Sequence, residues 1–294
     1  MKEIQKVEFD SDLEITLKAV LTKDFFLHAK KNSKNVNVYR IKYISNKHLV
    51  AGFIVEPKSI KTKLPVIIAN RGGNRNFADF RLGRVFTELA DMAQWGYIVF
   101  ASQLSGYENS EGKDEFGGRE LKDILNLHKI IQAHPKADAK RIGMIGHSRG
   151  GMMTYLCLAK VRWIKAAISV AVLANLERSA QERPDLATIY KELFDVNKKE
   201  VEKRSSVCWP EKFSKKTPLL LMHGTTDWRV SPLDSLELST KLYEKRVPHR
   251  LILFEGDDHM LSSHKKEVTD QIHAWFDRFL KRGEALPNLK PHGR

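Results

Sequence analysis

The stretch Ile145-Gly146-His147-Ser148-Arg149-Gly150-Gly151 decides the fold of this 294-residue chain. It fits the pattern G-x-S-x-G, follows the apolar run Arg141–Gly146 and opens an apolar helical segment. A serine on such a sharp strand-to-helix turn needs small neighbours, because its backbone is strained and the helix packs closely on the strand. The helix N-terminus also favours developing negative charge. The pattern therefore predicts a nucleophile at Ser148; the alternative is a glycine-rich turn with an incidental serine.

Eight short segments are predicted to be strands, because they are apolar and β-branched runs bounded by turn formers. They are Val36–Ile44, His48–Glu56, Leu64–Asn70, Tyr97–Ser102, Arg141–Gly146, Ala166–Val172, Pro218–His223 and Arg250–Glu255. The first two segments alternate in polarity around the short link Ser45-Asn46-Lys47, which predicts an antiparallel N-terminal hairpin. The later segments are more continuously apolar, as expected of strands that are covered on both faces.

Helix-length segments lie between these strands: Asp79–Ala93, Gly118–Ala133, Ser148–Lys160, Pro232–Lys245 and Lys265–Leu280. This alternation predicts an α/β fold with an eight-stranded, mostly parallel sheet and helices on both faces. We expect a single domain over residues 1–294. Residues 1–35 form an N-terminal extension that contains a predicted helix at Leu13–Leu21, and the long charged insertion over residues 173–216 predicts a helical cap.

A serine nucleophile requires a general base, and the base requires an orienting acid. In open α/β sheets these groups lie on loops just past the carboxyl ends of strands, in the chain order serine, acid, histidine. Asp227 follows the seventh predicted strand, and His259 follows the eighth. We therefore expect Ser148, Asp227 and His259 to form a catalytic triad.

Other acids and histidines near these positions fit the roles less well. Asp257 and Asp258 lie too close in sequence to His259 to be its natural partner, and are predicted to cap or bind within their loop. His223 lies inside a predicted strand, where a histidine is more often a satisfied core residue. His147 neighbours the nucleophile, but the turn should direct its side chain away from the serine.

An oxyanion hole requires two backbone N–H donors beside the nucleophile. One should be the N–H of Arg149, the residue after the serine. The second should come from the loop after the third predicted strand, where Gly72 and Gly73 let the backbone approach an oxygen without interference from side chains. The choice between these two glycines stays open, and a simple tight turn is the alternative interpretation of this loop.

Several stretches together resemble the catalytic domain of the prolyl oligopeptidase family of serine peptidases. They are Arg71-Gly72-Gly73-Asn74, Ser105-Gly106-Tyr107 through Gly112-Lys113-Asp114-Glu115-Phe116-Gly117-Gly118, Gly146-His147-Ser148-Arg149-Gly150-Gly151, His223-Gly224-Thr225-Thr226-Asp227 and Gly256-Asp257-Asp258-His259. The resemblance covers roughly residues 50–283, and it implies an α/β-hydrolase fold. Dienelactone hydrolases and acetyl esterases are related hydrolases with the same fold.

This resemblance implies a serine hydrolase that cleaves peptide, amide or ester bonds through an acyl-enzyme, with no cofactor and no metal. The family likeness favours a peptidase. A carboxylesterase is the alternative, because family peptidases usually carry a large N-terminal β-propeller and residues 1–35 leave no room for one. A non-catalytic binding protein on the same fold is an alternative of another class.

Three further side chains are candidates for substrate contacts. Arg71 and Arg75 border the predicted oxyanion hole, and arginine binds carboxylates bidentately, so one of them is predicted to recognise an acidic group on the substrate. The alternative is a salt bridge to a cap or loop carboxylate. Some family members use a tyrosine or histidine for the oxyanion about where Arg71 stands. Trp228 is predicted to wall the acyl pocket, with simple packing as its alternative.

The composition limits the partners and the compartment. The net charge of +14 comes from lysines spread along the chain rather than gathered in a stripe, so we expect no nucleic-acid partner. No apolar run is long enough to span a membrane, and the N-terminus lacks the apolar core of a signal peptide. Two cysteines are too few for a disulfide framework. We therefore expect a cytoplasmic protein that acts on a small molecule or a short peptide.

Overall fold

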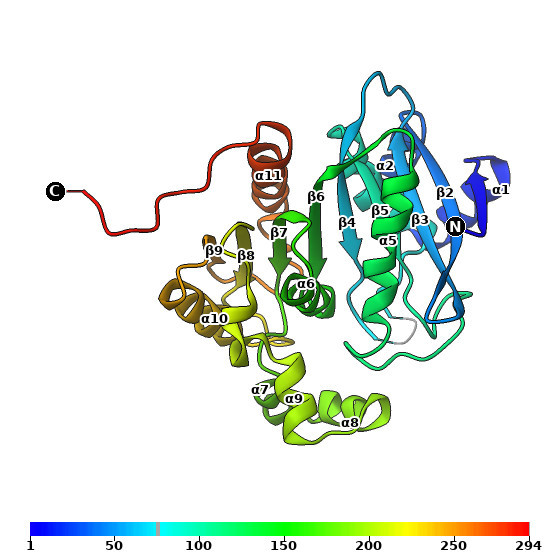
Figure 1. Ribbon diagram of the computed structural model, residues 1–294. Coiled ribbons are helices and arrows are strands. Elements are labelled where there is room, and N and C mark those ends of the chain that lie inside the picture. Colours follow the sequence, from blue (N-terminus) through cyan, green and yellow to red (C-terminus); the bar gives the residue numbers. More distant parts are fainter. Residues whose placement is uncertain (75–76, 294) are drawn as a thin grey trace. The chain divides into compact units, whose positions relative to one another are not determined.

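A computed structural model describes residues 1–74 and 77–293 of the chain (Figure 1). By its internal contacts the chain divides into two compact units. The N-terminal unit contains Met1–Asp114 and Arg119–Ile142, and the C-terminal unit contains Glu115–Gly118 and Gly143–Arg294. The expectation of a single domain stays a prediction.

The strands of the N-terminal unit form a mixed sheet in the order β1-β2-β3-β5-β4. Their bounds are β1 (Glu3–Val7), β2 (Val36–Ser45), β3 (His48–Pro57), β4 (Leu64–Asn70) and β5 (Ile98–Ser102). The pairs β1–β2, β2–β3 and β3–β5 are antiparallel, and β4–β5 is parallel. Ser45 pairs with His48 around Asn46 and Lys47, whose φ angles of 50° and 70° suit a tight hairpin turn. The predicted antiparallel hairpin is confirmed.

The first strand was not predicted from the sequence. Glu3–Val7 reads EIQKV, and four of its five residues are exposed. Two charged residues and one amide leave too few apolar positions for a strand signal, so only its pairing with β2 reveals the strand. The described residues therefore contain nine strands rather than the predicted eight.

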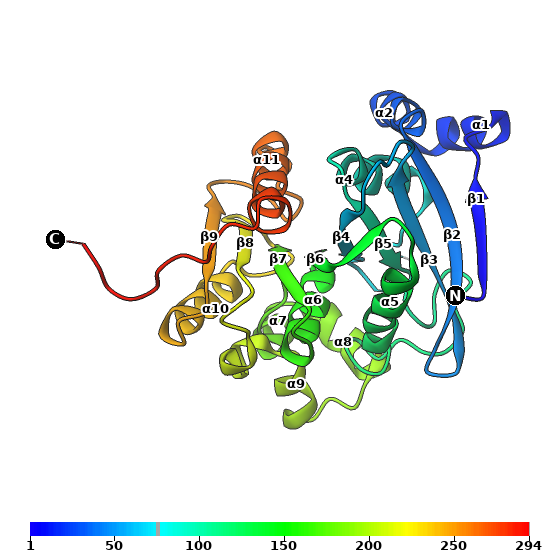
Figure 2. The same ribbon diagram turned by 45° about the horizontal axis from the view of Figure 1, so that its top comes forward.

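Helices cover both sides of the N-terminal strands (Figure 2). The predicted helix after β4 is a continuous run of α3 (Leu82–Arg84), a π-helical turn (Val85–Leu89) and α4 (Ala90–Gln94), which packs on β3 and β5. On the other side α5 (Leu121–Ala133) packs on β4 and β5. The N-terminal extension holds α1 (Ser11–Val20) and α2 (Lys23–Ser33), of which only the first was predicted.

The C-terminal unit has its own parallel strands, β7 (Ile164–Val170), β8 (Leu219–Gly224) and β9 (His249–Phe254). The strand β6 (Ala137–His147) crosses the boundary between the units and leads into α6 (Arg149–Lys160). α6 packs on β7, α10 (Leu233–Glu244) packs on β8 and β9, and α11 (Lys265–Phe276) packs against β7 from the other side (Figure 2). β8 is fully buried along its length, as its apolar run predicts.

The insertion between β7 and β8 is helical. It contains α7 (Leu176–Glu182), α8 (Pro184–Leu193), α9 (Lys198–Arg204) and two 3₁₀ turns (Ser206–Cys208 and Pro210–Lys212). Its role as a cap stays a prediction. Among the described residues, no helix combines the length and the apolar character that a membrane crossing requires.

Candidate active site

Ser148 lies on a strained turn between β6 and α6. Its φ of 55° and ψ of −126° are unusual for a residue with a side chain. The turn is held because the Ser148 N–H donates to Val170 O at 2.8 Å and the Ser148 carbonyl accepts from Gly151 N at 2.9 Å. A Cβ on Gly146 would lie 2.1 Å from the Gly150 carbonyl, so only glycine fits there. The serine itself is half-buried at the start of a helix.

Asp227 and His259 come together from the loops after β8 and β9. His259 Nδ1 lies 2.7 Å from Asp227 Oδ2, and both residues are buried. The other carboxylate oxygen accepts the backbone N–H groups of Arg229 at 2.8 Å and Val230 at 3.0 Å. Burial acts to raise the pKa of Asp227, but the hydrogen bonds from His223 and His259 outweigh it and hold that pKa well below its usual value. Asp227 is therefore a fixed anion beside the His259 ring.

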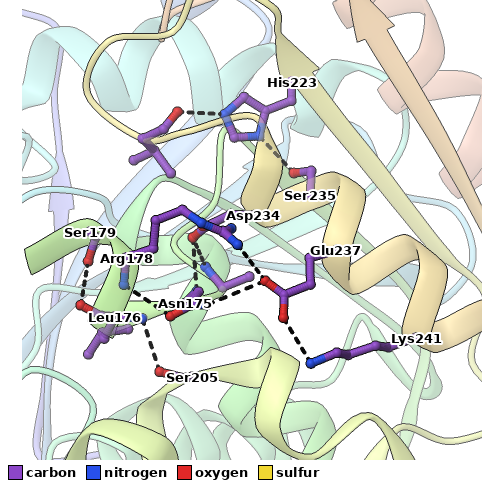
Figure 3. Close-up of polar contacts among 12 residues, drawn as sticks. Asn175, Leu176, Arg178, Ser179, Ser205, His223, Asp234, Ser235, Glu237 and Lys241 are labelled. Carbon is purple, nitrogen blue, oxygen red and sulfur yellow. Dashed lines mark hydrogen bonds and ion pairs between the residues drawn. The ribbon is translucent and has the colours of Figure 1, made fainter. Parts of the chain in front are cut away.

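A second histidine contacts the same carboxylate. His223 Nε2 lies 3.1 Å from Asp227 Oδ2 and 3.0 Å from Val230 O. Its Nδ1 lies 2.7 Å from Ser235 Oγ (Figure 3). The sequence predicted a satisfied core histidine here, and His223 is indeed fully buried with partners on both ring nitrogens. Its contact with Asp227 was missed. The four-residue spacing between His223 and Asp227, across the end of a strand, was the signal that could have revealed it.

The loop that carries His259 is organised by Asp257. This carboxylate accepts the backbone N–H groups of Asp258 and Ser263 and contacts His264 Nδ1 at 2.8 Å. The Asp257 carbonyl accepts from both the N–H and the hydroxyl of Thr226, which ties the acid loop to the histidine loop. These bonds fit the prediction that Asp257 binds within its loop.

His147 also supports the histidine loop. Its Nε2 donates to the backbone carbonyl of His259 at 2.7 Å, and the two rings lie 4.7 Å apart. Among the described residues, no hydrogen bond joins Ser148 Oγ to His259 Nε2. In enzymes without bound substrate this contact is often long and tightens only in the complex.

The residues predicted for the oxyanion hole lie in different units. Arg149 follows Ser148 in the C-terminal unit, and its buried guanidinium lies 4.5 Å above the Phe116 ring. Gly72 and Gly73 belong to the N-terminal unit, where Gly73 has a φ of 64°. The composition of the hole therefore stays a prediction.

Arg71 lies inside the N-terminal unit rather than on its surface, with 2% of its area exposed. Its guanidinium donates to Gln103 O at 3.2 Å and to Phe77 O at 2.9 Å, and stacks over the Tyr107 ring at 4.9 Å. These contacts favour a role in holding the loop after β4. Recognition of a substrate carboxylate by Arg71 remains untested, and Arg75 lies outside the described residues.

Trp228, next to Asp227 in the sequence, is 65% exposed. The guanidinium groups of Arg183 and Arg229 lie 4.8 and 5.1 Å from its ring. This exposure argues against the alternative of simple packing. A part in the acyl pocket stays a prediction.

An ion-pair network ties the insertion to α10 (Figure 3). Asp234 is buried and accepts the backbone N–H groups of Ala174 and Asn175 as well as Arg178 Nη1 at 2.8 Å. Arg178 also contacts Glu237 at 2.7 Å. Burial raises the pKa of Asp234 above its usual value, although these hydrogen bonds oppose the rise. The first helix of the insertion is therefore fixed to the helix that follows β8.

The parallel strands, the strained serine turn and the buried acid–histidine pair define the class of protein: a serine hydrolase of the α/β-hydrolase kind. The model of the prolyl oligopeptidase family matches residues 84–283, and the chain belongs to this family. Among the residues described here, no group of three or more His, Cys, Asp or Glu side chains is arranged to hold a metal ion.

Relatives agree with this assignment. The chain is similar to the uncharacterized peptidase YtmA of Bacillus subtilis, with 27% identity over 83% of this chain and 94% of YtmA. It is 25% identical to dipeptidyl-peptidase 5 of Porphyromonas gingivalis over 75% of this chain, but spans only 34% of that longer protein. The acylaminoacyl peptidase of Pyrococcus horikoshii has the same fold, with a TM-score of 0.77 and 23% identity over 88% of this chain and 44% of that structure.

Proposed function

We propose that this serine hydrolase is a peptidase that cleaves the acyl bond of short peptides or acylated amino acids, with Ser148 as nucleophile, His259 as base and Asp227 as acid. One observation carries the proposal: the 2.7 Å contact between His259 Nδ1 and Asp227 Oδ2, made by loops after neighbouring parallel strands. The strained turn at Ser148, in the same unit, supplies the nucleophile that this pair would serve.

In the proposed mechanism, His259 Nε2 takes the hydroxyl proton of Ser148 as its oxygen attacks the substrate carbonyl. The charge that develops on the carbonyl oxygen is stabilised by the Arg149 N–H and by a second donor from Gly72 or Gly73. His259 then passes the proton to the leaving group. Water, activated by the same histidine, hydrolyses the acyl-enzyme and releases Ser148. Asp227 stays ionised throughout and stabilises the imidazolium.

The names of the relatives favour amide bonds as substrates, since YtmA and dipeptidyl-peptidase 5 are both called peptidases. The chain spans about a third of dipeptidyl-peptidase 5 and nearly half of the acylaminoacyl peptidase structure, so their specificities need not apply here. Turnover of an acyl-aminoacyl anilide compared with a short p-nitrophenyl ester separates a peptidase from a carboxylesterase. The cytoplasmic location stays a prediction from the sequence.

The proposal is tested by labelling with a fluorophosphonate probe. We expect one adduct on the intact protein, mapped to Ser148 by peptide mass and absent from Ser148→Ala. Ser59→Ala, at an exposed loop position, is the matched control and should label like the wild-type protein. A folded wild-type protein without the adduct would contradict the proposal and favour a binding protein on this fold.

A further inference from the structure

The carboxylate of Asp227 receives a hydrogen bond in each of four directions. Two come from the backbone N–H groups of Arg229 and Val230 to Oδ1. Two come from imidazoles to Oδ2: His259 at 2.7 Å and His223 at 3.1 Å. The acid side chain is fully buried, so its orientation depends on these four donors rather than on water.

The neighbours of His223 determine where its proton lies. Nε2 faces the Val230 carbonyl and a carboxylate, which can only accept hydrogen bonds, so Nε2 carries the proton. On the other side of the ring, Nδ1 lies within hydrogen-bond distance of the Ser235 hydroxyl, at 2.7 Å. Ser235 is itself fully buried in the first turn of α10 (Figure 3). The imidazole is therefore held from both sides, and its Nε2–H is shared between the Val230 carbonyl and the proposed triad acid.

We infer that His223 is a positioning residue for the proposed triad: its Nε2–H fixes the Asp227 carboxylate and sets how strongly Oδ2 interacts with His259. The inference rests on the proposed function. A donor on Oδ2 withdraws electron density from the same oxygen that accepts the His259 Nδ1–H. His223 therefore affects how strongly Asp227 holds the His259 ring as well as orienting the acid, whereas a purely structural core histidine would do neither.

Three substitutions separate these contributions. His223→Gln keeps a side-chain N–H near the position of Nε2. His223→Asn is too short for that and reaches only toward Ser235, so it removes the donor to Asp227 while keeping a polar side chain. Ser235→Ala leaves the imidazole in place but removes the partner of Nδ1. The readout is the second-order rate of Ser148 labelling by a fluorophosphonate between pH 5 and about 9, with the melting temperature measured in parallel.

We expect His223→Asn to slow labelling roughly 10- to 100-fold, because a misplaced acid disturbs the attack geometry. The acidic limb of its pH profile should move upward by about half a pH unit, since Oδ2 becomes a stronger acceptor for the His259 proton. His223→Gln should stay within about threefold of the wild-type rate, with its limb unmoved, and Ser235→Ala should fall between the two. His147, the other titratable side chain against the His259 ring, is unchanged in all three variants.

Two outcomes overturn the inference while leaving the proposed function intact. In one, folded His223→Asn labels Ser148 at the wild-type rate with an unmoved acidic limb. In the other, Gln and Asn lose the same activity, which would mean that the donor at Nε2 is irrelevant. If His223→Asn does not fold, Ser235→Ala decides, and a wild-type rate and profile there would equally reject the inference. Absence of labelling in the wild-type protein is the separate failure of the proposed function.

Discussion

Two loops of this hydrolase follow the ends of parallel strands, and each contains a buried charged side chain close to the strand end. In the C-terminal unit, Asp227 lies in the loop after β8 and accepts N–H groups from the backbone and from two imidazoles. In the N-terminal unit, Arg71 lies in the loop after β4 and donates to the carbonyls of Phe77 and Gln103. One loop is organised around an acceptor, and the other around a donor.

The difference explains which of the two charges is available for chemistry. One partner of Asp227 is His259, a side chain that can exchange a proton, so the charge of the carboxylate acts on a reacting group. Arg71 instead donates to the main-chain carbonyls of Phe77 and Gln103, which neither titrate nor move away easily. A buried charge is thus a candidate for a catalytic role when it contacts a side chain that can exchange a proton. When it contacts main-chain groups, it more simply stabilises the loop.

Asp227→Asn tests this comparison with the largest expected effect. The amide would still fit the site but could not accept all four donors, and it would favour the wrong tautomer of His259. We expect kcat/KM, or the rate of fluorophosphonate labelling, to fall about 10⁴-fold with the fold retained. Asp258→Asn, in the neighbouring loop, is the control and should change the rate by less than about tenfold. A small loss in Asp227→Asn would mean that another acid serves His259.

Arg71→Met tests the scaffold side of the comparison. The apolar side chain keeps most of the volume but removes the hydrogen bonds that Arg71 donates to the carbonyls of Phe77 and Gln103. Unsatisfied buried carbonyls typically cost 1–3 kcal/mol each, so we expect the free energy of unfolding to drop by about 2–4 kcal/mol in urea denaturation. A stable variant whose KM rises only for acidic substrates would instead assign Arg71 to substrate recognition.

Two glycines with similar positive φ angles, one in the loop after β4 and one in the loop after β9, allow a direct comparison. Gly73 and Gly256 have φ angles of 64° and 66°, so alanine costs roughly 1 kcal/mol at either position. A Cβ on Gly73 would also lie 2.2 Å from Phe77 O, whereas a Cβ on Gly256 has no atom within 4 Å. We expect Gly73→Ala to destabilise the protein by about 1–2 kcal/mol more than Gly256→Ala, measured by urea denaturation. Equal losses of stability would show that the backbone after β4 shifts at little cost to relieve the contact with Phe77 O.

The smallest expected effect is in the pH dependence of stability. Hydrogen bonds hold the pKa of Asp227 below its unfolded value of about 3.9, after opposing its burial. The stabilisation from this group is therefore fully present above about pH 5 and is lost as the pH falls through the lower, folded value. Asp227→Asn should show a shallower decrease in unfolding free energy below about pH 4. Parallel curves for the two proteins would contradict the assigned shift.

The strands and helices with strong apolar patterns were predictable from the sequence. β8 and β9 appeared as apolar runs, and the loops after them were predicted to lie at the carboxyl ends of the parallel strands. The helix α2 was missed because its polar sequence, KDFFLHAKKNS, buries only Phe26, Ala29 and Asn32. Its stability comes from tertiary contacts such as Asn32 Nδ2 to Phe86 O at 3.0 Å, which no local pattern reveals.

The sequence predicted which loops carry the candidate site residues, but not the contacts that depend on how those loops fold. Asp227 and His259 could be paired from chain order and loop position alone. The contact of His223 was missed because it depends on how the end of β8 and the following loop fold back on each other. The burial of Arg71 was missed for a similar reason, since its partners lie 6 and 32 positions away in the sequence.

Two adjacent residues in the first turn of α10, Asp234 and Ser235, have different structural roles. Asp234 anchors the start of the insertion, and Ser235 contacts the His223 imidazole, which in turn contacts Asp227. A chimera that carries the insertion of a relative therefore needs matching residues on α10 as well as in residues 173–216. Arg178 pairs with Asp234 and Glu237 on α10, so a foreign insertion without a matching arginine would leave the buried Asp234 carboxylate without its ion pair. That carboxylate is adjacent in sequence to Ser235, which supports the proposed triad acid through His223.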